Sequence, residues 1–312
     1  MPSTDAGHSE HGPPHGASRQ PGRDSHRRKL RAALLVTATF LLVEVVGGLI
    51  SGSLALLADA AHMFTDVAAL TMAFAAMTLA DRSATKRYTF GFYRAEILAA
   101  FVNAQMLVLI GAYILYEAYT RFRDPSVIDT TVMLWVAVAG LLANLVSVRL
   151  LHSHDHDNLN MKAAYLEVVT DTVGSATVIV VALVIARTGW LWLDPLASVA
   201  IACFILPRTI GILRQATHVL LEGTPRHIDL AALRRELAQI PGVEEIHDFH
   251  FWTLTSGVDC ASVHVRTSPD TERFAVRRAV ERTLSVAAGI DHVTVQVEEL
   301  SEEDCASAQA HG

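Results

Sequence analysis

Cysteine is scarce in this chain of 312 residues, which has only Cys203, Cys260 and Cys305, without paired spacing. A framework of disulfides is therefore not expected. Charged residues are also few, at 18% of the chain, whereas 51% of the residues are hydrophobic and the mean hydropathy is +0.33. This balance excludes a typical soluble protein and predicts a membrane protein with a modest soluble part.

Clustered positive charge is lacking near the end of the chain. Residues 214–312 carry 9 Lys or Arg against 16 Asp or Glu, whereas the preceding residues carry 16 of each. Nucleic acids require clustered positive charge, so no nucleic-acid partner is expected, whereas an acidic surface attracts divalent cations. The His-Glu-x-x-His string of zinc hydrolases is also absent. An enzyme is therefore not expected.

Long apolar runs are what the chain does contain. A bilayer takes roughly 20 apolar residues to cross, and six runs are long enough. They lie at 30–50, 54–79, 97–119, 132–151, 163–186 and 191–213. A signal peptide is the alternative for the first run, but this run is too long and leads directly into the second. Basic residues gather before the first run and after the second and fourth, which places both termini in the cytoplasm.

Composition divides the chain into four parts. Residues 1–29 form a His-containing tail rich in Pro, Gly and Ser, which is expected to be disordered. The six-helix transmembrane domain follows at 30–213, and an acidic tail ends the chain at 301–312. Between them, residues 214–300 alternate helical and strand-like patterns, which predicts a cytoplasmic α+β domain. Because about 85 residues bury only a marginal core, dimerisation is expected to help.

Two pairs of metal-type ligands lie inside the apolar runs. His62 and Asp66 are four residues apart in the second run, and Glu167 and Asp171 are four apart in the fifth. Each pair therefore lies on one face of its helix. Isolated polar residues that hydrogen-bond between helices are the alternative, but intramembrane ionisable groups are usually functional. One imidazole and three carboxylates predict a four-coordinate site that suits Zn²⁺.

Such a site also suggests a mechanism. A divalent cation would displace protons from the ligands, and its release would let the protons return. Metal–proton exchange follows if the site opens alternately to the two sides of the membrane. Asp59 lies on the same helix face as His62, either near an entry path or as a cap for local polar groups. Glu44 and Asn103 are also embedded, and helix packing explains them at least as well as contact with the ion.

Several stretches together resemble the cation diffusion facilitator family of metal transporters, in the branch of bacterial zinc, cadmium and cobalt exporters. They are SLALLADAAHMFTD at 53–66, YTFG at 88–91, RAEILAA at 94–100, DTVGS at 171–175, DP at 194–195, LLEGTP at 220–225 and HDFHFW at 247–252. The resemblance implies six transmembrane helices, a cytoplasmic ferredoxin-like domain, a homodimer in the bacterial inner (plasma) membrane and export by proton antiport. It also implies that the second and fifth helices supply the transport site. The metal is then substrate and possible regulator, with no cofactor.

One position departs from the family pattern. Similar zinc exporters usually have His where Glu167 stands. A carboxylate there makes the site harder and more negative, so Mn²⁺, Co²⁺ or Fe²⁺ is the alternative main substrate to Zn²⁺, and Cd²⁺ and Co²⁺ are further candidates. A membrane metal sensor without transport is the alternative of another class. The buried ligand pairs favour transport, because a sensor has no need of charge inside the membrane.

Other histidines are candidate ligands outside the membrane. His152, His154 and His156 lie in the connection between the fourth and fifth runs, where they either collect metal or form a solvated polar loop. In the α+β domain, the candidates are His247, His250, His264 and His292. They are similar to family positions where metal adjusts the packing of the two subunits, although surface or core histidines are commoner than ligands.

Overall fold

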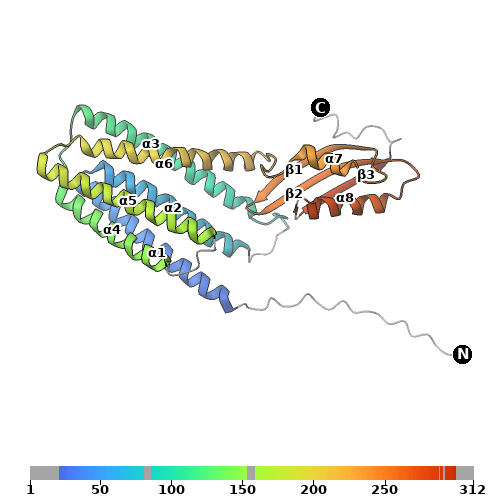
Figure 1. The fold of residues 1–312 in the computed structure, drawn as a ribbon, viewed down its shortest axis with the longest axis horizontal. Coiled ribbons are helices and arrows are strands. Elements are labelled where there is room, and N and C mark those ends of the chain that lie inside the picture. Colours follow the sequence, from blue (N-terminus) through green and yellow to red (C-terminus); the bar gives the residue numbers. More distant parts are fainter. Residues whose placement is uncertain (1–20, 81–85, 153–158, 288, 291, 300–312) are drawn as a thin grey trace.

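The structure is a computed structural model that describes residues 21–80, 86–152, 159–287, 289–290 and 292–299. Six long helices lie together, and a smaller unit of helices and strands follows them (Figure 1). The long helices are α1 (Pro21–Ser51), α2 (Leu54–Ala80), α3 (Tyr93–Arg123), α4 (Thr130–His152), α5 (Leu159–Thr188) and α6 (Leu193–Leu220). The smaller unit comprises α7 (Leu230–Leu237), β1 (Glu245–Thr255), β2 (Val258–Thr267), α8 (Arg273–Ala287) and β3 (His292–Glu299).

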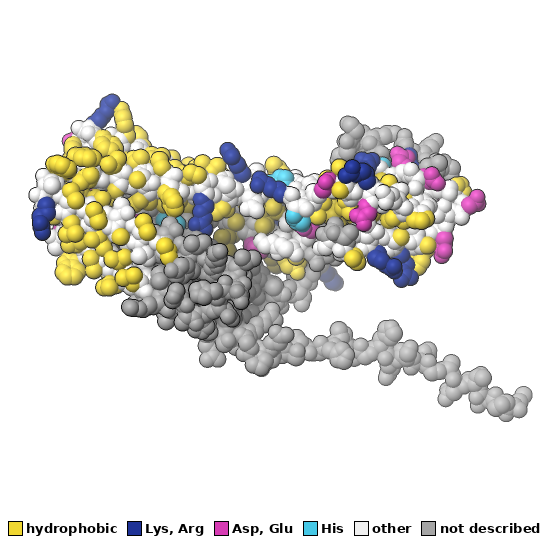
Figure 2. Space-filling view, viewed as in Figure 1, with side chains coloured by type: hydrophobic (Ala, Val, Ile, Leu, Met, Phe, Trp, Pro, Cys, Tyr) yellow, Lys and Arg dark blue, Asp and Glu magenta, His cyan; other side chains and the backbone are white. Residues whose placement is uncertain are grey.

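The long helices have an apolar outer surface. Figure 2 shows hydrophobic side chains over the helical part, whereas Asp and Glu gather on the smaller unit. Leu35, Leu109 and Phe204 are 68%, 64% and 66% exposed, which in water would be an aggregation liability. Within the described residues, four segments are long and apolar enough to cross a membrane: Leu34–Ser51, Tyr93–Arg123, Asp171–Thr188 and Leu193–Leu220. The helical part is therefore a membrane domain.

Two predicted boundaries differ from the structure. The tail was expected to reach residue 29, whereas α1 begins at Pro21. Proline is tolerated in the first turn of a helix, where its missing N–H would have no partner in any case. The sixth helix was expected to end at residue 213, but α6 continues to Leu220. This extension carries the chain directly to the smaller unit.

A buried carboxylate of α6 fixes the start of α2. Asp194 is fully buried and accepts hydrogen bonds from the Ser53 hydroxyl at 2.6 Å and from the N–H groups of Leu54 at 2.8 Å and Ala55 at 3.2 Å. The first N–H groups of a helix have no partner within the helix, so Asp194 caps α2 from another element. The cap holds α2 against α6 and thereby positions the residues further along α2, including His62.

The smaller unit is a three-stranded sheet with helices on one face. The strand order is β1-β2-β3, with β1 antiparallel to β2 and β2 parallel to β3 through the α8 crossover. Leu237 of α7, Val263 of β2 and Leu284 of α8 are fully buried in one core. The described residues thus form an αββαβ order, with one strand fewer than the ferredoxin-like order predicted from the sequence. His264 follows Val263 along β2, so its side chain points to the face away from the helices.

The smaller unit contacts the membrane domain at the first turn of α3. The carboxylate of Glu96 accepts hydrogen bonds from the hydroxyls of Thr255 at 2.7 Å and Ser256 at 2.9 Å, where β1 turns into β2. Arg94 pairs at 2.6 Å with Glu222, which follows α6 and has a φ of 58°. The β1–β2 turn and the connection after α6 are therefore both joined to α3.

Candidate metal centres

The first candidate centre joins α2 to α5 inside the membrane domain. Nε2 of His62 lies 2.9 Å from Oδ1 of Asp171. One donor atom each from His62, Asp66 and Asp171 lie within 4.8 Å of one another. His62 is only 8% exposed, and the two carboxylates are partly buried. We call these three residues the helix centre; they are three of the four ligands predicted from the sequence.

The fourth predicted ligand is Glu167. It belongs to α5 and lies one turn before Asp171, on the same side of the helix. Its side chain is outside the part of the chain that the structure describes. The participation of Glu167 in the helix centre therefore stays a prediction.

The donor set of the helix centre fits a divalent transition metal. Around a tetrahedral Zn²⁺ with bonds of about 2.0–2.1 Å, neighbouring donors lie about 3.3 Å apart. The 2.9 Å between Nε2 of His62 and Oδ1 of Asp171 is slightly shorter than this value, and all three donor atoms lie within 4.8 Å of one another, so small side-chain movements would bring the three onto one ion. Asp66 and Asp171 provide two negative charges, which balance a divalent ion, and His62 provides the imidazole nitrogen that Zn²⁺ and Co²⁺ accept.

Two more carboxylates are buried close to the helix centre. Asp59 precedes His62 by one turn and is 6% exposed; a Cβ added at Gly174 of α5 would come within 3.0 Å of its Oδ1. Glu44 of α1 is 1% exposed, and within the described residues its Oε2 has no hydrogen-bond partner. Asp59 thus lies in the interior against α5, and its place near an entry path stays a prediction.

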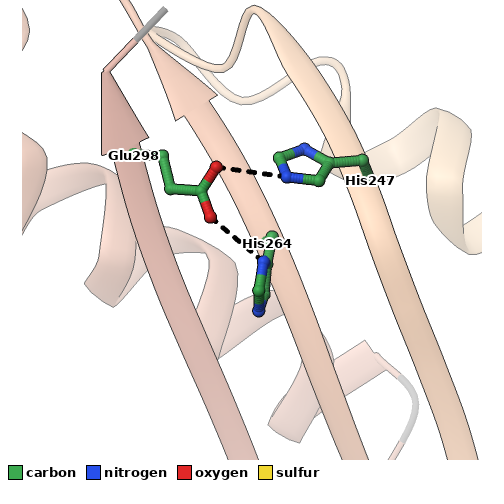
Figure 3. Close-up of side chains that lie close together, drawn as sticks. All are labelled: His247, His264 and Glu298. Atoms are coloured by element: carbon green, nitrogen blue, oxygen red, sulfur yellow. Dashed lines mark ion pairs between the residues drawn. The ribbon is translucent and has the colours of Figure 1, made fainter. Parts of the chain in front are cut away.

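The second candidate centre lies on the face of the sheet that points away from α7 and α8. Nε2 of His247 is 3.2 Å from Oε2 of Glu298, and Nδ1 of His264 is 3.1 Å from Oε1 of the same carboxylate (Figure 3). The three residues come from β1, β2 and β3, and one donor atom of each lies within 4.8 Å of the others. We call them the sheet centre. Two imidazoles and one carboxylate, with a position left open, form a donor set that Zn²⁺ accepts.

The sequence predicted only the histidines of the sheet centre. The candidate ligands from the sequence in this domain were histidines alone, so Glu298 was not among them; in the structure, β3 extends through Glu298 to Glu299. Along β3, exposed and half-buried side chains alternate from His292 to Val297, and Glu298 is buried although it falls at an exposed position of this alternation. Extending the period-two pattern by one residue would have placed a carboxylate beside His264.

Of the other predicted histidines, the two with described side chains, His250 and His292, are not among the three residues of either centre. Nε2 of His250 lies 2.8 Å from Oδ1 of Asp248, whose Oδ2 is 3.6 Å from Nε2 of His264, so His250 is adjacent to the sheet centre. His292 is exposed at the start of β3, and its ring lies edge-on to Phe90 at 5.5 Å. His152 is the last residue of α4, and its side chain is outside what the structure describes. His154 and His156 also lie outside the described residues.

Comparisons with known proteins cover nearly the whole chain. Residues 30–221 match the cation efflux transmembrane domain, and residues 225–300 match the cytoplasmic domain of cation efflux proteins. The chain is 47% identical to the metal cation efflux system protein CzcD of Cupriavidus metallidurans over 277 residues, which are 88% of this chain and 87% of that protein. It is 42% identical to the zinc transporter ZitB of Escherichia coli over 290 residues, which are 92% of each. A cadmium, cobalt and zinc/H(+)-K(+) antiporter of Bacillus subtilis is 38% identical over 279 residues, which are 88% of this chain and 89% of that protein.

Proposed function

This chain belongs to the cation efflux family, and on that premise we propose that it exports divalent metal ions in exchange for protons, with Zn²⁺ as its main substrate. The single observation that carries the proposal is the helix centre, where His62, Asp66 and Asp171 gather within an apolar bundle. Charge at that depth is costly unless a cation or a proton compensates it. CzcD and ZitB, whose names describe metal efflux and zinc transport, support the same function.

Proton exchange follows from the chemistry of the ligands. His62 must be neutral and Asp66 and Asp171 ionised to bind a metal, so each metal ion that enters displaces protons. When the ion leaves on the far side, protons return to the ligands and keep the buried charge low. Two orientations of the helix centre, each open to one side of the membrane, turn this exchange into antiport. The Bacillus subtilis relative is named as an antiporter with protons, which supports this step.

We assign all six long helices as membrane spans, with both termini in the cytoplasm of a bacterium and the protein in its inner membrane. The transmembrane domain then runs from residue 30 to the end of α6 at Leu220, and the cytoplasmic domain follows up to residue 300. The tails at 1–29 and 301–312 lie on either side. The cytoplasmic domain is a ferredoxin-like unit without its first strand. A homodimer would give this small domain the additional buried surface that it needs.

The sheet centre has a regulatory role in this proposal. Metal at His247, His264 and Glu298 would link β1, β2 and β3. The site would fill as the metal concentration in the cytoplasm rises. The β1–β2 turn contacts Glu96 of α3, so a rearrangement of the sheet can reach the membrane domain. The histidines of the connection after α4, His152, His154 and His156, would deliver metal to the helix centre.

Transport of several metals in one assay tests the proposed function. Purified protein in liposomes, given equal gradients of Zn²⁺, Cd²⁺, Co²⁺ and Mn²⁺, is expected to move Zn²⁺ fastest and Cd²⁺ or Co²⁺ next. A lead by Mn²⁺ would keep the transporter but change its substrate. If folded protein binds these metals but moves none of them, the protein is a membrane metal sensor.

A further inference from the structure

An arginine lies directly beside the sheet centre. In the sheet register, Arg266 of β2 is opposite Glu298 of β3 on one side and Glu245 of β1 on the other. His264 precedes it by two residues and so points to the same face of the sheet. The carboxylate of Glu298 therefore lies between the histidines of the sheet centre and the guanidinium of Arg266 on β2.

Four nitrogens surround the carboxylate of Glu298. On Oε1, Gln296 donates a hydrogen bond at 2.9 Å and Nδ1 of His264 lies at 3.1 Å. On Oε2, Nε2 of His247 lies at 3.2 Å and Nε of Arg266 at 3.7 Å. A metal ion would take over the histidine nitrogens as ligands and leave Gln296 and Arg266 in place. Of these two, only Arg266 carries a charge.

We propose that Arg266 is a competing cation built into the sheet centre, and that it sets the metal concentration at which this centre fills. The inference rests on the proposed regulatory role of the sheet centre. Without metal, the guanidinium compensates the charge of Glu298. When metal binds, the same positive charge repels the ion. The Arg266 side chain is only 13% exposed, so water screens this repulsion incompletely.

Arginine suits this role better than lysine or histidine would. Its guanidinium does not lose its proton in proteins, so the repulsion persists at every physiological pH. Arg266 is also held in place from the far side, because its Nη1 donates to Oε2 of Glu245 at 3.0 Å. Glu245 therefore draws the guanidinium away from Glu298 and partly offsets its charge. Removing Glu245 and removing Arg266 must then act on metal affinity with opposite signs.

Metal titration of the full-length protein tests the inference. The background is the Asp66→Asn/Asp171→Asn protein, in which the helix centre is disabled, and Zn²⁺ binding is measured against a competing chelator. We expect Arg266→Gln to bind Zn²⁺ about tenfold more tightly, the size that Coulomb's law gives for such a charge even under the screening of bulk water. Glu245→Gln is expected to weaken binding several-fold. The double variant should bind more tightly than Glu245→Gln and slightly less tightly than Arg266→Gln, because the Glu245 carboxylate also attracts the ion directly.

Control variants separate charge from packing. Arg266→Lys keeps the charge and should retain affinity close to that of the unmodified background. Arg277→Gln removes a guanidinium that pairs with Glu281 on α8 and should change nothing. The melting temperature shows whether Arg266→Gln folds. If it does not fold, the effect of Glu245→Gln on Zn²⁺ affinity is the remaining test, and the inference requires weaker binding. Unchanged or weaker binding by folded Arg266→Gln, or tighter binding by Glu245→Gln, would overturn the inference.

One further variant distinguishes this inference from the function on which it rests. His264→Ala should remove the titrated site. If it leaves Zn²⁺ binding unchanged, the sheet centre is not a metal site and the inference about Arg266 falls with it. Export through the helix centre is measured separately in liposomes. The proposed transport function can therefore hold whether or not His264→Ala changes Zn²⁺ binding.

Discussion

Glu96, in the first turn of α3, accepts a hydrogen bond of 2.7 Å from Thr255, although the two residues are 159 positions apart in the chain. The contact joins a membrane helix to the turn between β1 and β2. The same two strands contribute His247 and His264 to the sheet centre. A change in the sheet therefore has a short route to α3, which packs against α2 and α6 in the membrane.

Thr255→Val should weaken the coupling of transport to the sheet centre. The substitution keeps the shape of the side chain and removes the shorter of the two hydrogen bonds that Glu96 accepts, leaving the one from Ser256. If the contact carries the signal, His264→Ala lowers Zn²⁺ transport in the unmodified protein and has a smaller effect in Thr255→Val. Transport rates of the four proteins of this double-mutant cycle give the coupling.

Thr253→Val is the matched control for that cycle. The Thr253 hydroxyl donates to Asp259 at 2.7 Å and stays within the smaller unit. It should leave the effect of His264→Ala intact. Independent, additive effects of Thr255→Val and His264→Ala would show that the signal takes another route.

Asp66→Asn and Asp171→Asn should each abolish transport while the protein stays folded. An amide has almost the shape of a carboxylate but lacks the charge that compensates a divalent ion. We expect a loss of Zn²⁺ transport of at least about 100-fold, because each substitution removes a direct ligand, and changes to the outer-shell partners of ligands already cost 10–100-fold. Asp124→Asn, at an exposed position after α3, should transport normally. Full activity in either variant of the helix centre would exclude that residue as a ligand.

Glu167→His tests the fourth predicted ligand. Imidazole is a softer donor than carboxylate, and the change also removes a negative charge from the site. We expect the ratio of Zn²⁺ to Mn²⁺ transport to rise, measured with both metals in the same liposomes. A metal profile identical to that of the unmodified protein would place the selectivity elsewhere.

Asp194→Ala should lower the thermal stability of the protein without removing a metal ligand. The substitution leaves the Ser53 hydroxyl and the N–H groups of Leu54 and Ala55 without their buried acceptor. Lost hydrogen bonds to a charged group cost about 2 kcal/mol, which corresponds to a melting temperature lower by about 5 °C in a domain of this size. Thermal unfolding in detergent measures the change, with Asp124→Ala as the control. An unchanged melting temperature would show that Asp194 does not hold α2.

The sequence predicted those features that depend on the spacing of residues within one helix or strand. The apolar runs predicted the long helices, and the four-residue spacing of His62 and Asp66 placed both on one face of α2. Their approach to Asp171 was also predictable, because buried charges in two helices need a common partner. The cap of α2 by Asp194 and the contact of Glu96 with Thr255 were not predictable. Each joins elements distant in sequence, and such contacts depend on how whole helices and strands pack.

Proton movement driven by metal is the direct consequence of exchange at the helix centre, and it can be measured in liposomes. Liposomes containing the purified protein and an internal pH indicator are given a Zn²⁺ gradient at constant membrane potential. We expect protons to move against the direction of Zn²⁺, and the Asp66→Asn/Asp171→Asn protein to move neither. Zn²⁺ transport without any proton movement would contradict the exchange mechanism, and proton movement that persists in the double variant would contradict the helix centre as its site.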